Sequence, residues 1–162
     1  MKRYVALLIT VLLLFMCLFS LGCDRRGFLS EREKQELYDE IEGLIRSGEI
    51  WDYEAEPWLS SAWETDYQAH KSIEILKSAA NAAYDSEAGN SIGGYWAESK
   101  TSWRVLNVEL NNFSLPGDDR EGVRYIFSAA KNKDGTILLS VSDIEPGSDT
   151  WKPVTEVAFH KD

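Results

Sequence analysis

Apolar residues recur with two different periods along this chain, and the change of period divides it into a helical part and a strand part. Between residues 30 and 88 the apolar positions are three or four residues apart, as on one face of a helix. Between residues 101 and 160 they alternate with polar positions, as on one face of a strand. The pattern predicts an α+β fold, with two to three N-terminal helices packed on an antiparallel sheet of about four strands.

The first helix has a clear start and a clear end. Ser30 and Glu33 form a capping-box pattern, in which each side chain can bond the other residue's backbone N–H. Ser47-Gly48 predicts its end, because glycine readily takes the left-handed conformation of a helix cap. The apolar residues between them share one face of the helix, and they are Leu37, Ile41, Leu44 and Ile45.

The second helical region is predicted to begin near Pro57, a residue favoured in the first turn of a helix, and to reach about Ser86. A second capping-box pattern at Thr65 to Gln68 leaves open whether this is one helix or two with a bend. Its best apolar stripe consists of Ala62, Ala69, Ile73, Leu76, Ala80 and Ala83.

Four segments alternate in the manner of strands, and the stretch SIGGYW before them is predicted to be a loop. Asp134-Gly135 is a strong hairpin signal between the second and the third strand. The predicted strands cover residues 103–110, 123–130, 137–144 and 154–160.

The N-terminus differs from the rest of the chain. Lys2 and Arg3 precede nineteen uncharged, mostly apolar residues that end at Gly22, directly before Cys23. This stretch resembles the signal peptide and lipobox of bacterial lipoprotein precursors, which implies that Cys23 is acylated and becomes the new N-terminus. On this interpretation residues 1–23 are a signal peptide, 24–29 a tether and 30–162 a single α+β domain, with its helical part at 30–88 and its strand part at 101–160.

An uncleaved single-pass anchor is the alternative, because nineteen residues of helix span about 28 Å, close to the thickness of the hydrocarbon core. The lipoprotein resemblance implies a lipid anchor in the cell membrane, with the domain outside the cytoplasm. Asp24 after the cysteine would imply the periplasmic face of the inner membrane if the cell is Gram-negative.

Charge limits the partners of the remaining chain. The first 23 residues hold two of the 17 basic residues and none of the 27 acidic ones, so without them the net charge changes from −10 to −12. Such an acidic surface repels phosphates, which argues against nucleic acid and against electrostatic adsorption to anionic lipid. Membrane attachment must then come from the N-terminal lipid.

Few residues of the chain suggest catalysis. The sequence contains no nucleophile elbow, no phosphate-binding glycine loop and no zinc-spaced Cys/His set, so a non-catalytic role without a cofactor is favoured. Asp66, His70 and Glu74 could share one helix face and hold a metal ion, or could simply be a solvated face. Acidic loops at 85–90 and 117–121 allow the same two interpretations for calcium.

Aromatic residues are unusually dense near the start of the second helical region. Rings beside carboxylates stack on sugars and anchor protein interfaces, but they also fill small cores that lack disulfides. Both interpretations stay open for this set, which consists of Trp51, Tyr53, Trp58, Trp63 and Tyr67.

These observations predict a lipid-anchored envelope protein that binds an envelope protein or a cell-wall glycan without catalysis. Two alternatives remain. One is an inhibitor or immunity lipoprotein whose acidic surface blocks a basic toxin or wall hydrolase. The other is a metal-dependent enzyme that uses Asp66, His70 and Glu74.

Overall fold

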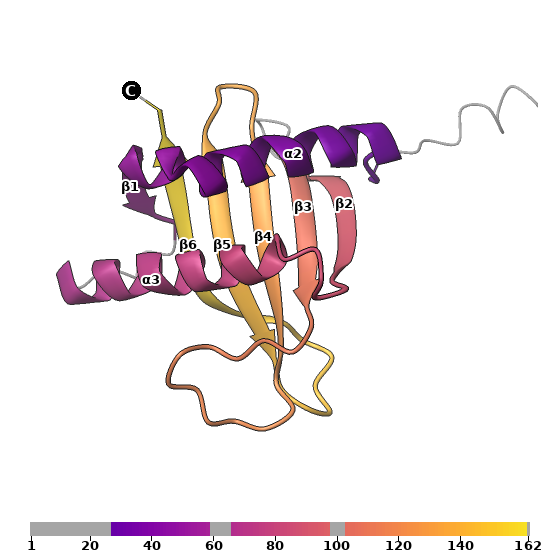
Figure 1. The fold of residues 1–162 in the computed structure, drawn as a ribbon, viewed down its shortest axis with the longest axis vertical. Coiled ribbons are helices and arrows are strands. Elements are labelled where there is room, and N and C mark those ends of the chain that lie inside the picture. The colour runs from indigo at the N-terminus through magenta and orange to yellow at the C-terminus, as the bar shows by residue number, and fades with distance from the viewer. Residues whose placement is uncertain (1–26, 59–65, 98–102, 162) are drawn as a thin grey trace, which may run out of the picture.

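The computed structural model describes residues 27–58, 66–97 and 103–161 of the chain, with the side chain of Asp66 excepted. Figure 1 shows its elements, in which two α-helices cross a curved sheet. In chain order they are α2 (Glu31–Ser47), the 3₁₀-helix η1 (Glu49–Asp52), β1 (Glu54–Pro57), α3 (Asp66–Ala83), β2 (Ser91–Ala97), β3 (Trp103–Leu110), β4 (Arg124–Lys131), β5 (Ile137–Ile144) and β6 (Lys152–His160).

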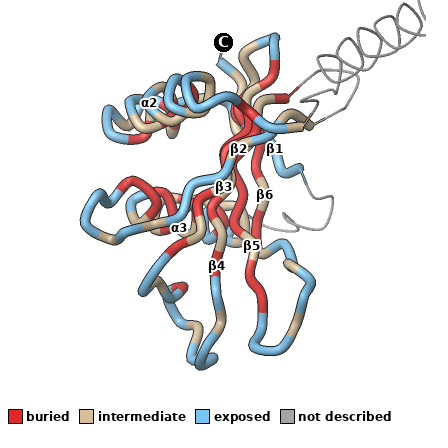
Figure 2. Tube along the Cα trace, turned by 90° about the vertical axis from the view of Figure 1, so that its right-hand side faces the viewer, coloured by how far each residue is buried: buried red, intermediate tan, exposed pale blue. Residues whose placement is uncertain are grey.

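The strands form one six-stranded sheet in the order β1-β6-β5-β4-β3-β2, and every neighbouring pair is antiparallel. Strands β2 to β6 follow one another as hairpins, whereas β1 joins the far edge beside β6. Both helices lie on the same side of the sheet (Figure 2). We call the sheet surface beneath them the covered face and the opposite surface the outer face.

The main core lies between the helices and the covered face. Buried residues of α2 and α3 meet alternate residues of the central strands, as the period of two requires. The largest fully buried side chains of this layer include Leu37, Ile41, Leu76, Leu106, Phe127, Leu139 and Phe159.

The predicted ends of α2 are confirmed. Ser30 and Glu33 form the reciprocal capping box, and Gly48 ends the helix in the left-handed conformation with φ of 79°. Its N–H bonds the carbonyl of Ile45, so the cap satisfies one of the carbonyls left free at the helix end.

The predicted fold class is wrong in the size of the sheet. The described part of the chain holds two α-helices on six strands, where two to three helices on about four strands were expected. The four predicted strands are present as β3 to β6. The two unpredicted ones, β1 and β2, are the edges of the sheet and lie outside residues 101–160.

The edge strands do not show a clear alternation of apolar and polar residues, because they bury little side-chain surface. Strand β1 has only four residues, of which three are exposed, and β2 carries Gly93-Gly94 in its middle. The expectation that a helix begins near Pro57 is also wrong. Pro57 ends β1, and the helix begins at Asp66. Proline suits an edge strand, where no ladder bond is needed from its nitrogen.

Residues 27–29, predicted to belong to a tether, are part of the sheet edge. The N–H of Leu29 donates to the carbonyl of Gly94 at 3.1 Å, and the N–H of Trp96 donates to the carbonyl of Gly27 at 2.9 Å. Phe28 and Tyr95 form an antiparallel bridge between these bonds. Cys23 and the rest of the predicted signal peptide lie outside the described residues. Within the described ranges, no helix has both the length and the apolar character needed to cross a bilayer.

Candidate functional site

The outer face carries a small apolar cluster of its own. Trp103, Val105 and Ala130 are buried there, and Ala97 and Leu138 pack against them. The register places Val105, Ala130 and Leu138 side by side on β3, β4 and β5. This cluster is separate from the core beneath the helices, so the sheet has apolar side chains on both faces.

Directly beside this cluster, four polar residues form a line across the sheet, which we call the polar row. Its members are Asn107 on β3, Ser128 on β4, Ser140 on β5 and Glu156 on β6. Each is the Cα partner of the next in the strand register. Three strand spacings give the row a length of about 14 Å.

The side chains of the polar row have no partners among the residues that the structure describes. No side-chain hydrogen bond or ion pair joins Asn107, Ser128, Ser140 or Glu156 to any other residue that the structure describes. Ser140 is only 9% exposed, and the other three are half-buried. Their polar atoms reach solvent, because none of them is among the fully buried side-chain atoms that lack a hydrogen-bond partner in the described residues. A row of such groups is therefore a place where an external ligand can bind.

Glu156 is the one charged group of the row. Burial raises the pKa of its carboxyl above the ordinary glutamate value, and no cation offsets that effect within the described residues. A carboxylate held without a partner destabilises the fold slightly, and such groups are common where a protein binds or reacts with something else.

Trp58 stands at the end of the polar row. Its backbone N–H donates to the carbonyl of Glu156 at 3.0 Å, which continues the ladder of β1 by one residue. Its ring meets that of Trp103 edge to face, with centroids 6.0 Å apart, yet 54% of Trp58 stays exposed. The outer face therefore has an exposed aromatic ring beside a carboxylate and a line of small polar groups.

The other predicted aromatic residues do not join Trp58. Trp51 packs against Phe159 at the core, with ring centroids 5.8 Å apart, and Tyr53 lies half-buried against the same core. Tyr67 is exposed on α3, and Trp63 lies outside the described residues. Trp51 and Tyr53 therefore fit the core interpretation, whereas Trp58 and Tyr67 fit the surface interpretation.

The three residues proposed as metal ligands are only partly visible. His70 and Glu74 are exposed on α3, and Glu74 pairs with Lys77 at 3.4 Å. Asp66 begins the helix, but its side chain lies outside the description. Among the described residues, no three His, Cys, Asp or Glu side chains lie close enough together to hold a metal ion.

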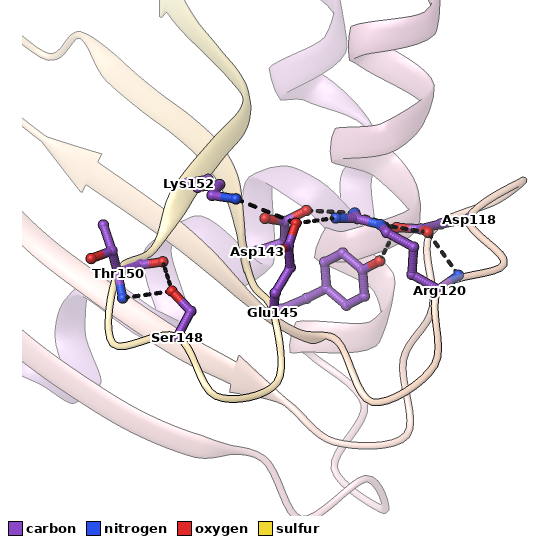
Figure 3. Close-up of polar contacts among 8 residues, drawn as sticks. Asp118, Arg120, Asp143, Glu145, Ser148, Thr150 and Lys152 are labelled. Atoms are coloured by element: carbon purple, nitrogen blue, oxygen red, sulfur yellow. Dashed lines mark hydrogen bonds and ion pairs between the residues drawn. The ribbon is translucent and has the colours of Figure 1, made fainter.

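The acidic loop at 117–121 is organised around a cation of the protein itself. Arg120 donates to Asp118 at 2.6 Å and to buried Asp143 at 2.5 Å, and it lies 3.5 Å from Glu145 (Figure 3). The hydroxyl of Tyr125 also donates to Asp118. These contacts tie the β3–β4 loop to the end of β5.

Titration of this network follows from its contacts. Hydrogen bonds from Arg120 and Tyr125 hold the pKa of Asp118 well below its usual range. Burial, followed by the bond to Asp118, raises the pKa of Tyr125 to about 12. Asp118, the acid of this loop that the network holds, is therefore occupied by a guanidinium, so the network has a structural role.

The loop at 85–90 is bonded to its surroundings in a similar way. The Asn90 side-chain amide caps α3 by donating to the carbonyl of Ala82 at 2.7 Å, and its oxygen accepts the N–H of Asn111 at 2.9 Å. Asp85 accepts the N–H of Glu87 at 2.9 Å. These bonds stabilise the helix end.

A groove of about 420 Å³ lies between α2 and the ends of β3 and β4, lined by Trp96 and several charged residues. Two of its basic groups, Arg104 and Lys131, both pair with Glu40 of α2. Since two of its three cations, Arg104 and Lys131, are used within the fold, the groove has fewer free binding groups than the polar row.

Sequence reasoning did not identify the polar row, because its members come from four strands and only the register aligns them. The one available signal was that each occupies a polar position in an alternating strand. No protein family model matches the chain, and neither curated proteins nor solved structures show a match to it.

Proposed function

We propose that the protein is a lipid-anchored envelope protein that binds cell-wall glycan, without catalysis, on the outer face of its sheet. The observation that carries this proposal is the polar row, a line of four polar side chains without internal partners beside the exposed ring of Trp58.

The chemistry of this surface suits a sugar chain. Hydroxyl, amide and carboxylate groups can exchange several hydrogen bonds with sugar hydroxyls, and a carboxylate gives the stronger, charge-assisted ones. An indole ring offers a flat apolar surface for the C–H face of a sugar. A linear polymer also fits a row about 14 Å long better than a compact ligand does.

The anchor comes from the N-terminal sequence. The lipobox-like residues before Cys23 support acylation, and the absence of another cysteine after residue 23 leaves this thiol as the only candidate in the mature chain. Two or three acyl chains give stable membrane attachment, whereas one alone is marginal.

Co-sedimentation with insoluble, protein-free peptidoglycan tests the ligand. We expect the detergent-solubilised full-length protein to sediment with it, and we expect Trp58→Ala and Glu156→Gln each to weaken binding by about tenfold, as the loss of one good contact to a charged or aromatic group does. Tyr67→Ala is the matched control, because Tyr67 is also an exposed aromatic residue but lies on α3. Binding that is unchanged in both outer-face variants would contradict the proposal.

Intact mass of the membrane-extracted protein tests the anchor separately. We expect a chain that starts at Cys23 and carries acyl groups, and we expect Cys23→Ala to abolish both features. A chain that retains Met1 without acyl groups would contradict lipid anchoring.

A further inference from the structure

We infer that the β2 edge of the sheet lies on the bilayer surface and fixes the orientation of the domain, an inference that rests on the proposed lipid anchor. We call this surface the apolar edge, and it consists of Phe28, Ile92 and Tyr95. Its occupant is the lipid surface that the acylated N-terminus enters.

The apolar edge holds most of the exposed apolar bulk in the described ranges. Only five large hydrophobic residues are exposed in the described ranges. Three of them form the apolar edge, namely Phe28 at 81%, Tyr95 at 38% and Ile92 at 37%. Ile92 and Tyr95 lie on opposite faces of β2, because three residues separate them along a strand. The two side chains therefore flank the edge from both sides, with Phe28 beside Tyr95.

The backbone of this edge is firmly held. Two hydrogen bonds and the bridge pair residues 27–29 with β2, and Leu29 is buried in the core. A Cβ on Gly94 would come within 3.1 Å of the Leu29 side chain, so glycine permits this close packing. The backbone on both sides of Phe28 is thus fixed by hydrogen bonds, while its ring is exposed.

The length of chain before Phe28 brings this edge to the membrane. Phe28 is five positions after Cys23, which corresponds to at most about 17 Å of extended chain. A lipid-bearing residue must lie at the bilayer surface, so Phe28 lies within that distance of it. Tyrosine is enriched at this depth, where its ring meets both headgroups and hydrocarbon, and phenylalanine is among the residues that interfacial segments bury at the acyl boundary.

Charge favours the same orientation. Near the apolar edge, Lys34 offsets the charge of Glu31 at 2.8 Å, whereas Glu33 keeps its negative charge within the capping box. The opposite edge, β1, presents exposed Glu54 and Glu56. Anionic headgroups repel that edge and leave the apolar edge as the favourable contact.

This orientation has a consequence for the polar row. The row begins beside β2, where Gly93 is the Cα partner of Asn107, and it ends at Glu156 on β6. If β2 lies on the bilayer, the row runs away from the membrane and its carboxylate end faces the cell wall. The outer face is then roughly perpendicular to the bilayer and accessible to a polymer.

Site-directed spin labelling of the lipidated full-length protein tests the inference. The acylated Cys23 is blocked, so Ser91→Cys on β2 and Glu54→Cys on β1 each give one labelled thiol in the mature chain. In vesicles of phosphatidylethanolamine and phosphatidylglycerol at 3:1, we expect the Ser91 label to be more accessible to oxygen than to a water-soluble nickel chelate. We expect the reverse for the Glu54 label.

Phe28→Asp should remove this difference between the two labels, because it places a charge at the apolar edge, while acylation persists. Tyr67→Asp, which changes an exposed aromatic residue on α3, should leave the difference intact. Equal, water-like accessibility of both labels in an acylated protein would overturn the docking and leave the anchor standing.

Two other outcomes are also decisive. Spin–spin broadening of the Ser91 label in detergent would show that a second copy covers the edge, and this would overturn the inference. Intact mass measured on the same sample separates the proposals, because a chain without acyl groups contradicts the anchor itself.

Discussion

The two faces of the sheet differ in how their side chains are buried and bonded. On the covered face, inward positions are apolar and fully buried beneath two helices, as Phe127 and Leu139 illustrate. On the outer face, the neighbouring residues of the same strands, Ser128 and Ser140, are small and polar, and their side chains have no partners in the described part of the chain. Packing therefore explains the covered face, whereas on the outer face it explains the cluster around Trp103 but not the polar row.

The difference separates side chains whose role in stability the structure explains from side chains that, on the proposed function, bind a ligand. A polar residue on a half-buried surface contributes to stability only when it is bonded. The Arg120 network meets that condition, since each of its carboxylates has a hydrogen bond or ion pair. The polar row does not, which makes it the better candidate for a function outside the fold.

The largest expected effect comes from two adjacent residues that face opposite sides of β4. Phe127→Ala should lower the free energy of unfolding by about 3–5 kcal/mol, because it opens a cavity beneath α3. Ser128→Ala should change it by less than about 0.5 kcal/mol. Urea denaturation followed by circular dichroism measures both. Equal losses for the two variants would show that the outer face is part of the structural core.

Two buried hydroxyls of the covered side should give a smaller effect of opposite sign. Tyr84 Oη and Thr155 Oγ1 are buried without a hydrogen-bond partner in the described part of the chain. Removing an unsatisfied buried group avoids its desolvation penalty, so Tyr84→Phe and Thr155→Val should each raise the free energy of unfolding by about 1 kcal/mol.

Tyr125→Phe is the matched control for these hydroxyls. The Tyr125 hydroxyl donates to Asp118, so its removal should destabilise the protein in the same thermal or urea denaturation assay. If all three variants were destabilised, the hydroxyls of Tyr84 and Thr155 would have partners in solution. Both hydroxyls would then be hydrogen-bonded, as the hydroxyl of Tyr125 is.

The sequence predicted the central strands well, because they are buried enough to show alternation. Strands β3 and β5 begin and end at the predicted residues, and β4 is shifted by one. The edge strands β1 and β2 could not be found this way, since Glu54, Glu56 and Gly93 bury little. An edge strand is specified mainly by its neighbour's free backbone groups, which leave no hydropathy pattern.

The candidate site was harder to predict for a different reason. Trp58 was singled out as part of an aromatic cluster, but Trp51, seven residues earlier, turns to the core instead. Between them the chain changes from η1 to β1, and this change sends the two rings to opposite faces. The polar row depends on the register of three strand pairs, which no local pattern contains.

The smallest expected effect concerns Glu156, and its sign depends on pH. Burial raises the pKa of this carboxyl in the folded state, so the folded protein holds the proton more tightly than the unfolded chain does. Stability should then fall as pH rises from about 4.5, the ordinary glutamate value, through the raised pKa, and it should be constant above that range. Glu156→Gln removes this loss. The variant should be more stable than the native protein at pH 7 by no more than about 0.5 kcal/mol, with the gain disappearing in acid.

Urea midpoints of the native protein and of Glu156→Gln, measured from pH 4 to pH 8, provide the test. A variant that is less stable at pH 7 would mean that the carboxylate has a stabilising partner in solution, and the polar row would then resemble the Arg120 network. The same substitution is expected to weaken glycan binding. A gain in stability together with a loss of binding would mean that the fold retains an unfavourable charge for its ligand, and this is the property that separates the outer face from the covered one.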